Sequence, residues 1–233
     1  MNEKITEIVF IIDRSGSMSG FEADTVGGFN STLKQQREDT LEGSTAYVTT
    51  VLFSNEAETV HDRLPIEKVA EMKLSDYRVG GCTALMDAVG DTVKHIREIH
   101  KYARPEDVPG HTIFIITTDG YENASRRYDA KSIKSLIKTM TDEYGWKFIF
   151  LAANIDAAEA AGNIGIAGSM AVNFDMTAEG CAKSYRAMSK AIKASRRGID
   201  ICECAEWREE LDADNAGKKT GKTSRGGSGG SRK

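Results

Sequence analysis

Apolar, β-branched runs alternate along this chain with segments in which apolar residues recur every three or four positions. The runs at 8–12, 46–53, 111–118 and 148–153 are too short to span a membrane and predict buried strands. The segments at 22–38, 84–100, 133–144 and 177–196 have the spacing of amphipathic helices. Strands separated by helices predict an α/β fold with a doubly wound, mostly parallel sheet and helices on both faces.

One pair of strands departs from this alternation. Residues 58–62 form a short, more polar segment only about four residues after the run at 46–53. This gap is too short for a helical crossover, so the two strands are predicted to pair antiparallel, with the short strand at the edge of the sheet. Residues 65–72 are expected to form a brief helix or turn, and 171–174 a weak last strand.

Oxygen-bearing side chains follow three of the predicted elements. Asp13, Ser15 and Ser17 come directly after the first apolar run, Thr83 follows a glycine pair at the start of a helix, and Asp119 precedes Gly120 at the end of another run. Any one of these is an ordinary turn or helix-cap residue. Their shared position after buried strands matters because open α/β sheets bind ligands at the carboxyl ends of their strands.

Together, Asp13-x-Ser15-x-Ser17, Thr83 and Asp119-Gly120 resemble the metal-ion-dependent adhesion site of the von Willebrand factor type A family. All five positions of that pattern are filled. The resemblance covers roughly residues 5–197 and implies the family's Rossmann-like sheet with one antiparallel edge strand. It further implies that Ser15, Ser17 and Thr83 bind the ion directly and that Asp13 and Asp119 bind it directly or through water.

A site of two carboxylates and three hydroxyls favours a hard divalent cation, so we expect Mg²⁺ or Mn²⁺, with Ca²⁺ possible, and not zinc or copper. The resemblance implies that a Glu or Asp of a protein partner fills the open position on the ion. Arg14, Arg126 and Arg127 lie near the motif and are candidates to steer such a partner.

Composition divides the chain into three parts. We expect one type A domain over residues 1–197, an amphipathic extension over 198–214 that contains Trp207 and Leu211, and a disordered, basic Gly/Ser-rich tail over 215–233. The six basic residues of the tail leave about −10 of formal charge on the remainder, although the whole chain carries −4. The acidic body argues against specific nucleic-acid binding.

Several features bear on location and on secondary roles. The amino terminus lacks a signal-peptide pattern, no apolar run spans a bilayer, and the four cysteines form no zinc pattern, so a cytoplasmic protein without membrane contact is expected. His95 and His100 are predicted to be solvated helix residues and Cys82 a packed thiol in a turn. Gly27 and Gly28 are expected to allow close approach of their helix to the sheet.

Two other functions remain open on the sequence alone. A metal-dependent phosphohydrolase can be built on the same fold, but the motif places no His, Lys or Glu as a general base, and no phosphate-binding glycine loop is present. A structural scaffold with a vestigial site is the other alternative. The favoured interpretation is a non-enzymatic, cation-dependent interaction module, similar to standalone adaptor modules of bacteria and phages.

Overall fold

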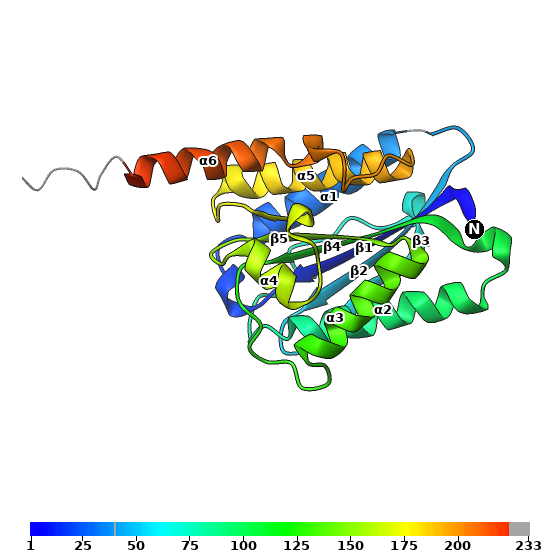
Figure 1. Ribbon diagram of the computed structural model, residues 1–233, viewed down its shortest axis with the longest axis horizontal. Coiled ribbons are helices and arrows are strands. Elements are labelled where there is room, and N and C mark those ends of the chain that lie inside the picture. The colour runs from blue at the N-terminus through cyan, green and yellow to red at the C-terminus, as the bar shows by residue number, and fades with distance from the viewer. Residues whose placement is uncertain (40, 224–233) are drawn as a thin grey trace, which may run out of the picture.

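The computed structural model describes residues 1–39 and 41–223, which form a central six-stranded sheet with helices on both sides (Figure 1). The predicted alternation of strands and helices is confirmed. The strands are β1 (Asn2–Asp13), β2 (Thr45–Phe53), β3 (Ala57–Pro65), β4 (Pro109–Thr118), β5 (Lys147–Ala152) and β6 (Ala171–Asn173). The helices are α1 (Glu22–Glu38), α2 (Leu85–Tyr102), α3 (Ala130–Tyr144), α4 (Ala157–Asn163), α5 (Ala178–Arg196) and α6 (Glu209–Thr223).

The strand order is β3-β2-β1-β4-β5-β6, and all neighbours are parallel except β2 and β3. The predicted antiparallel edge strand is therefore confirmed. Because β1 and β4 are adjacent at the centre, their carboxyl ends bring Asp13 and the residue after Thr118 to the same edge of the sheet. This is the edge at which ligands bind in open α/β sheets.

Helices α1, α5 and α6 cover one face of the sheet, and α2 and α3 cover the other (Figure 1). Residues 8–12 of β1 have exposed fractions of at most 1%, as a strand covered on both faces requires. The Phe10 ring meets Phe29 of α1 edge to face at 5.3 Å. Burial of each such side chain contributes about 1.5–3 kcal/mol, so Phe10→Ala would loosen α1 from the sheet.

Gly28 allows close packing between helices, not against the sheet as the sequence predicted. A Cβ atom at Gly28 would lie 2.1 Å from the ring of Tyr185, which belongs to α5. The pair α1 and α5 therefore packs with a tyrosine ring directly on the α1 backbone. None of the described helices is long and apolar enough to cross a membrane.

The prediction that His100 is solvated was wrong. Its side chain is 8% exposed, and its Nε2 lies 3.3 Å from Oε2 of Glu7, a fully buried carboxylate of β1. Arg63 of β3 reaches across β2 to the same Glu7 oxygen at 2.7 Å, over the ring of Tyr47. A carboxylate buried in the central strand draws both side chains inward, because an unpaired buried charge is costly.

The C-terminal segment is helical further than composition indicated. Helix α6 continues past Asp214 to Thr223, into the range for which the sequence predicted disorder, and residues 224–233 lie outside the described part of the chain. Polar contacts to α5 and β6 hold this helix: among them, Lys183 of α5 binds Asp214 at 2.7 Å, and the Asn215 side-chain amide donates to the Asn173 carbonyl at 3.0 Å. The division into three parts remains a prediction.

Candidate metal centre

Three loops meet at the carboxyl edge of the sheet, and each brings part of the predicted site. Asp13 ends β1, Thr83 immediately precedes the start of α2, and Asp119 directly follows β4. Four of the five side chains are buried, with exposed fractions of 3% or less, whereas Ser17 is exposed. The site therefore opens to solvent on the side of Ser17.

Hydrogen bonds link two of these loops directly. The Ser15 and Ser17 hydroxyls lie 3.1 Å apart, and the Ser17 hydroxyl donates to Oδ1 of Asp119 at 2.6 Å. Oδ1 of Asp13 accepts from the Ser15 backbone amide at 2.7 Å, which folds the chain back after the strand. The structure thus joins Asp13, Ser15, Ser17 and Asp119 in one network.

Thr83 faces the same network from the third loop. A Cβ atom built on Gly120 would lie 3.6 Å from the Thr83 hydroxyl oxygen and 3.8 Å from that of Ser17. Hydroxyls from two different loops therefore lie beside the glycine that follows Asp119. All five residues predicted from the sequence are brought together at one place.

Backbone contacts hold the first and second loops in register. The Gly16 amide donates to the Gly81 carbonyl at 3.0 Å, and the Gly80 amide donates to the Arg14 carbonyl at 2.9 Å. Gly81 has a φ of +83°, and a Cβ there would come within 3.0 Å of the Asn55 side chain. The left-handed conformation favours glycine before the Cys82-Thr83 pair, and a Cβ there would also press against the Asn55 side chain.

Asn123 is a supporting residue that sequence reasoning missed. Its side-chain Oδ1 accepts from the Thr83 backbone amide at 2.8 Å, and its backbone N–H donates to the Thr83 carbonyl at 3.0 Å. The neighbouring Glu122 carboxylate accepts from the Met86 amide in the first turn of α2 at 2.8 Å. Only the Asn/Glu composition of the loop after Asp119 hinted at these capping roles.

Asp13 also has supports that the motif does not include. Thr118, the last residue of β4, donates from its hydroxyl to Oδ2 of Asp13 at 2.6 Å. The buried Tyr77 hydroxyl donates to the Asp13 backbone carbonyl. These two residues, 64 and 105 positions further along the chain, fix the backbone and the carboxylate of Asp13 respectively.

The electrostatics of the two acids are unfavourable in the protein alone. Burial raises the pKa of the Asp13 carboxyl, opposed by the hydrogen bonds from Thr118 and Ser15, and the nearby Asp119 charge raises it further. Burial likewise raises the pKa of Asp119, opposed by the Ser17 hydroxyl. Two acids held side by side out of water favour a cation between them.

One oxygen of Asp119 supports the binding of a cation at this site. Its Oδ2 is buried and has no hydrogen-bond partner among the described residues, a state that costs free energy unless another group satisfies it. No described cluster of three or more His, Cys, Asp or Glu side chains could hold a metal, so this site would rely on hydroxyls beside its two acids. Such a donor set fits a hard divalent ion held by Asp13, Ser15, Ser17, Thr83 and Asp119.

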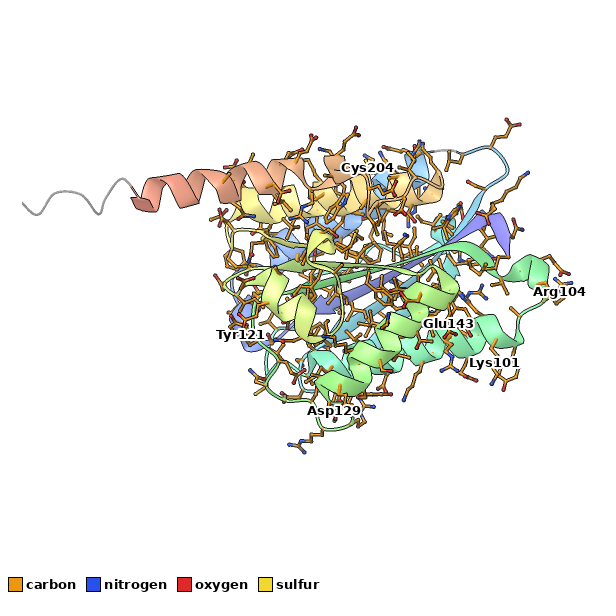
Figure 2. All side chains as sticks on the ribbon, viewed as in Figure 1. Lys101, Arg104, Tyr121, Asp129, Glu143 and Cys204 are labelled. Atoms are coloured by element: carbon orange, nitrogen blue, oxygen red, sulfur yellow. The ribbon has the colours of Figure 1, made fainter. Side chains whose placement is uncertain are left out.

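Around the five site residues, two of the three candidate arginines are already paired, and Cys82 lies differently from its prediction. Arg14 is paired with Glu58 at 2.6 Å, and Arg127 with Asp91 at 2.5 Å, which leaves Arg126 without a side-chain partner among the described residues. Cys82 is exposed, not packed, because Asn55 accepts its backbone amide at 2.6 Å and holds the turn at the surface. Tyr121 also projects into solvent beside the site (Figure 2).

Comparisons with known proteins show the same architecture. No family model and no curated protein matches the sequence. Among solved structures, the pilus adhesin SpaC from Lactobacillus rhamnosus GG matches at 14% identity with a TM-score of 0.59, covering 83% of this chain and 30% of its own. A von Willebrand factor type A protein from Catenulispora acidiphila matches at 13% identity and a TM-score of 0.54, covering 79% of this chain and 42% of its own.

A third structure carries a metal at the corresponding type of motif. Proximal thread matrix protein 1 from the mussel byssus, with a zinc-occupied metal-ion-dependent adhesion site, matches at 15% identity and a TM-score of 0.55. The match covers 81% of this chain and 46% of that one, so the chain spans less than half the length of these three structures. On the evidence of its strand order and these matches, the chain has the von Willebrand factor type A fold.

Proposed function

We propose that this protein is a divalent-cation-dependent interaction module that captures an acidic side chain of a protein partner. The observation that carries the proposal is the buried, unpartnered Oδ2 of Asp119 beside the converging hydroxyls of Ser17 and Thr83. When bound, the ion supplies an electrophilic position that a partner's carboxylate can fill.

The chain's own residues define what the site selects. Asp13 and Asp119 supply the negative charge, and the neutral hydroxyls of Ser15, Ser17 and Thr83 complete the donor set without neutralising the ion further. Ser17 is exposed, so a partner reaches the site from its side. We propose Mg²⁺ or Mn²⁺ as the resident ion and treat zinc, found in the mussel protein, as a competitor to be tested.

Selection from a random peptide display library tests this function without requiring an identified partner. Immobilised protein is exposed to the library in Mn²⁺ and eluted with a chelator, beside an Asp13→Ala variant. We expect enrichment of peptides containing Glu or Asp on the wild type alone. Equal recovery on the variant, or enrichment without acidic residues, would contradict the proposal.

We further propose that the module is not an enzyme and acts inside the cell as an adaptor. In the described part of the chain, no His or Lys side chain hydrogen-bonds to the five site residues, so neither residue type is held there as a general base for the phosphohydrolase alternative. Release of phosphate from a generic phosphomonoester, lost in Asp13→Ala, would favour that alternative.

A further inference from the structure

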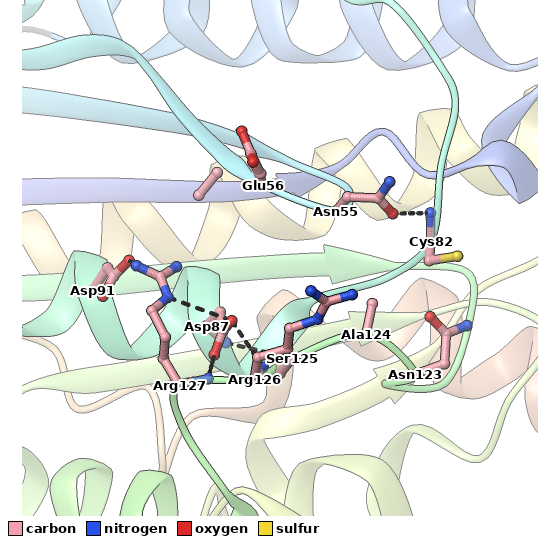
Figure 3. A pocket seen from close by; sticks show the side chains of 11 residues that line it. Asn55, Glu56, Cys82, Asp87, Asp91, Asn123, Ala124, Ser125, Arg126 and Arg127 are labelled. Atoms are coloured by element: carbon pink, nitrogen blue, oxygen red, sulfur yellow. Dashed lines mark hydrogen bonds and ion pairs between the residues drawn. The ribbon is translucent and has the colours of Figure 1, made fainter.

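A polar groove of about 880 Å³ lies beside the candidate metal centre (Figure 3). One wall is the turn between β2 and β3, and the other is the loop between β4 and α3. The groove begins at Cys82, next to Thr83, and at Asn123, which holds Thr83. The lining residues are Asn55, Glu56, Ala57, Cys82, Asp87, Asp91, Asn123, Ala124, Ser125, Arg126 and Arg127.

The carboxylates at the base of the groove are already satisfied. Asp87 accepts the backbone amides of residues 126, 127 and 128 at 2.9 to 3.1 Å. Asp91 accepts the Tyr128 hydroxyl at 3.0 Å and pairs with Arg127. Their charge is therefore offset by groups of the same loop, and these two acids are not free to bind a cationic ligand.

The groups that remain free are mostly donors. The acceptor oxygen of Asn55 is used by Cys82, and that of Asn123 by Thr83, which leaves both amide NH₂ groups available. The Arg126 guanidinium is exposed, makes no side-chain bond to a described residue, and points toward the side of Asn55 and Cys82 (Figure 3). A guanidinium flanked by amide donors favours a carboxylate.

Glu56 is the exception on the opposite wall. Its exposed carboxylate makes no ion pair with a described residue, so it would repel an acid bound on its side of the groove. This places the favourable position for a ligand carboxylate on the side of Arg126. Replacing Glu56 by Gln should therefore strengthen binding of an acid, and it removes no ion pair with a described residue.

We infer that the groove binds a second acidic residue of the same partner segment, through Arg126, while the first acid occupies the metal centre. The inference rests on the proposed function and narrows the partner to an extended segment carrying two carboxylates. Two linked contacts raise the overall affinity because the second forms at high effective concentration.

The exposed Cys82 allows the groove to be tested separately from the metal. A Cys202→Ser/Cys204→Ser background leaves Cys82 as the accessible thiol, because Cys181 is buried. The probes are a series of Gly/Ser peptides. Each contains one cysteine, present as a mixed disulfide with cysteamine, and one Glu or Gln whose distance from that cysteine increases stepwise through the series. The Cys82 thiolate attacks this disulfide, joins the peptide and releases cysteamine; the 2-mercaptoethanol concentration that frees half the peptide reports the non-covalent contact.

In chelator, we expect a Glu peptide of a suitable spacing to need about tenfold more reductant than its Gln counterpart. Arg126→Gln should abolish this difference, Glu56→Gln should increase it, and Arg97→Gln, the same charge change on α2 outside the groove, should leave it unchanged. Equal release of Glu and Gln peptides at every spacing, or a difference that survives Arg126→Gln, would overturn the inference.

Adding Mn²⁺ separates failure of the groove from failure of the metal centre. A peptide with a second Glu placed to reach the ion should need more 2-mercaptoethanol for release in Mn²⁺ than in chelator. Asp13→Ala should remove this metal-dependent increase and leave the effect of Arg126 unchanged. If this increment appears but the Arg126 effect does not, the groove proposal is wrong and the metal function stands. If the Arg126 effect appears without any metal increment, the groove binds acids and the proposed function is wrong.

Discussion

Asn123 holds Thr83 at two points, accepting its backbone amide at 2.8 Å and donating to its carbonyl at 3.0 Å. The two residues belong to different loops, so this pair ties the loop after β4 to the start of α2. Residues that orient metal ligands without touching the ion affect affinity strongly. The position of the Thr83 hydroxyl therefore depends on a side chain outside the five-residue motif.

Replacement of Asn123 should weaken the metal site without removing a ligand. We expect Asn123→Ala to lower Mn²⁺ affinity roughly tenfold, because Thr83 loses a fixed backbone position. Asn123→Asp keeps an acceptor for the Thr83 amide and should retain most of the affinity. Calorimetric titration of both variants checks this; equal weakening in the two would show that the amide contact is not what matters.

Thr118→Val should destabilise the protein and make the site more sensitive to protons. The substitution leaves Oδ2 of the buried Asp13 without its donor at 2.6 Å, at a cost of about 1–3 kcal/mol. The pKa of Asp13, which this hydrogen bond lowers, should rise further. Urea unfolding compares Thr118→Val with the control Thr117→Val. The Thr117 hydroxyl makes no hydrogen bond to a described residue, so its removal should cost much less free energy of unfolding.

Metal affinity should fall as pH falls, because protons compete for Asp13 and Asp119, both of which have raised pKa values. These two carboxyls should contribute the opposite trend to the stability of the metal-free protein. Between the ordinary pKa of 3.8 and the raised values, Asp13 and Asp119 bind more protons in the native state than in the unfolded chain, so their contribution to stability decreases as pH rises through that interval. Thermal melts from pH 4 upward, with and without Mn²⁺, measure both effects; parallel curves would contradict the assignment.

The buried Glu7 of β1 binds Arg63 of β3 and His100 of α2 away from the metal centre, and its disruption should affect stability alone. Arg63→Met leaves the fully buried Glu7 without its arginine and with His100 as its remaining side-chain partner, at an expected cost of about 3 kcal/mol. Glu7→Gln/Arg63→Met should recover much of this loss, because no uncompensated charge remains. Denaturant unfolding gives the comparison, and Mn²⁺ affinity of the folded variants should match the wild type.

The sequence predicted features that have local signatures. The apolar run at 8–12 identified the central strand, and the Asp13-x-Ser15-x-Ser17 motif could be recognised because its three residues lie within five consecutive positions. The supports from Asn123, Thr118 and Tyr77 escaped notice because each acts across loops distant in sequence. Partners distant in sequence also explain the burial of His100, which is drawn to Glu7 of another element.

Binding of Mn²⁺ followed by electron paramagnetic resonance tests the central claim most directly. Free Mn²⁺ loses signal when it binds, so a titration gives stoichiometry and affinity, and Mg²⁺ or Zn²⁺ added afterwards reports competition. We expect a single site per chain, displaced by Mg²⁺ and lost in Asp13→Ala and in Ser15→Ala/Ser17→Ala, with all variants still folded. No binding at millimolar Mn²⁺, or binding that persists unchanged in these variants, would contradict the account.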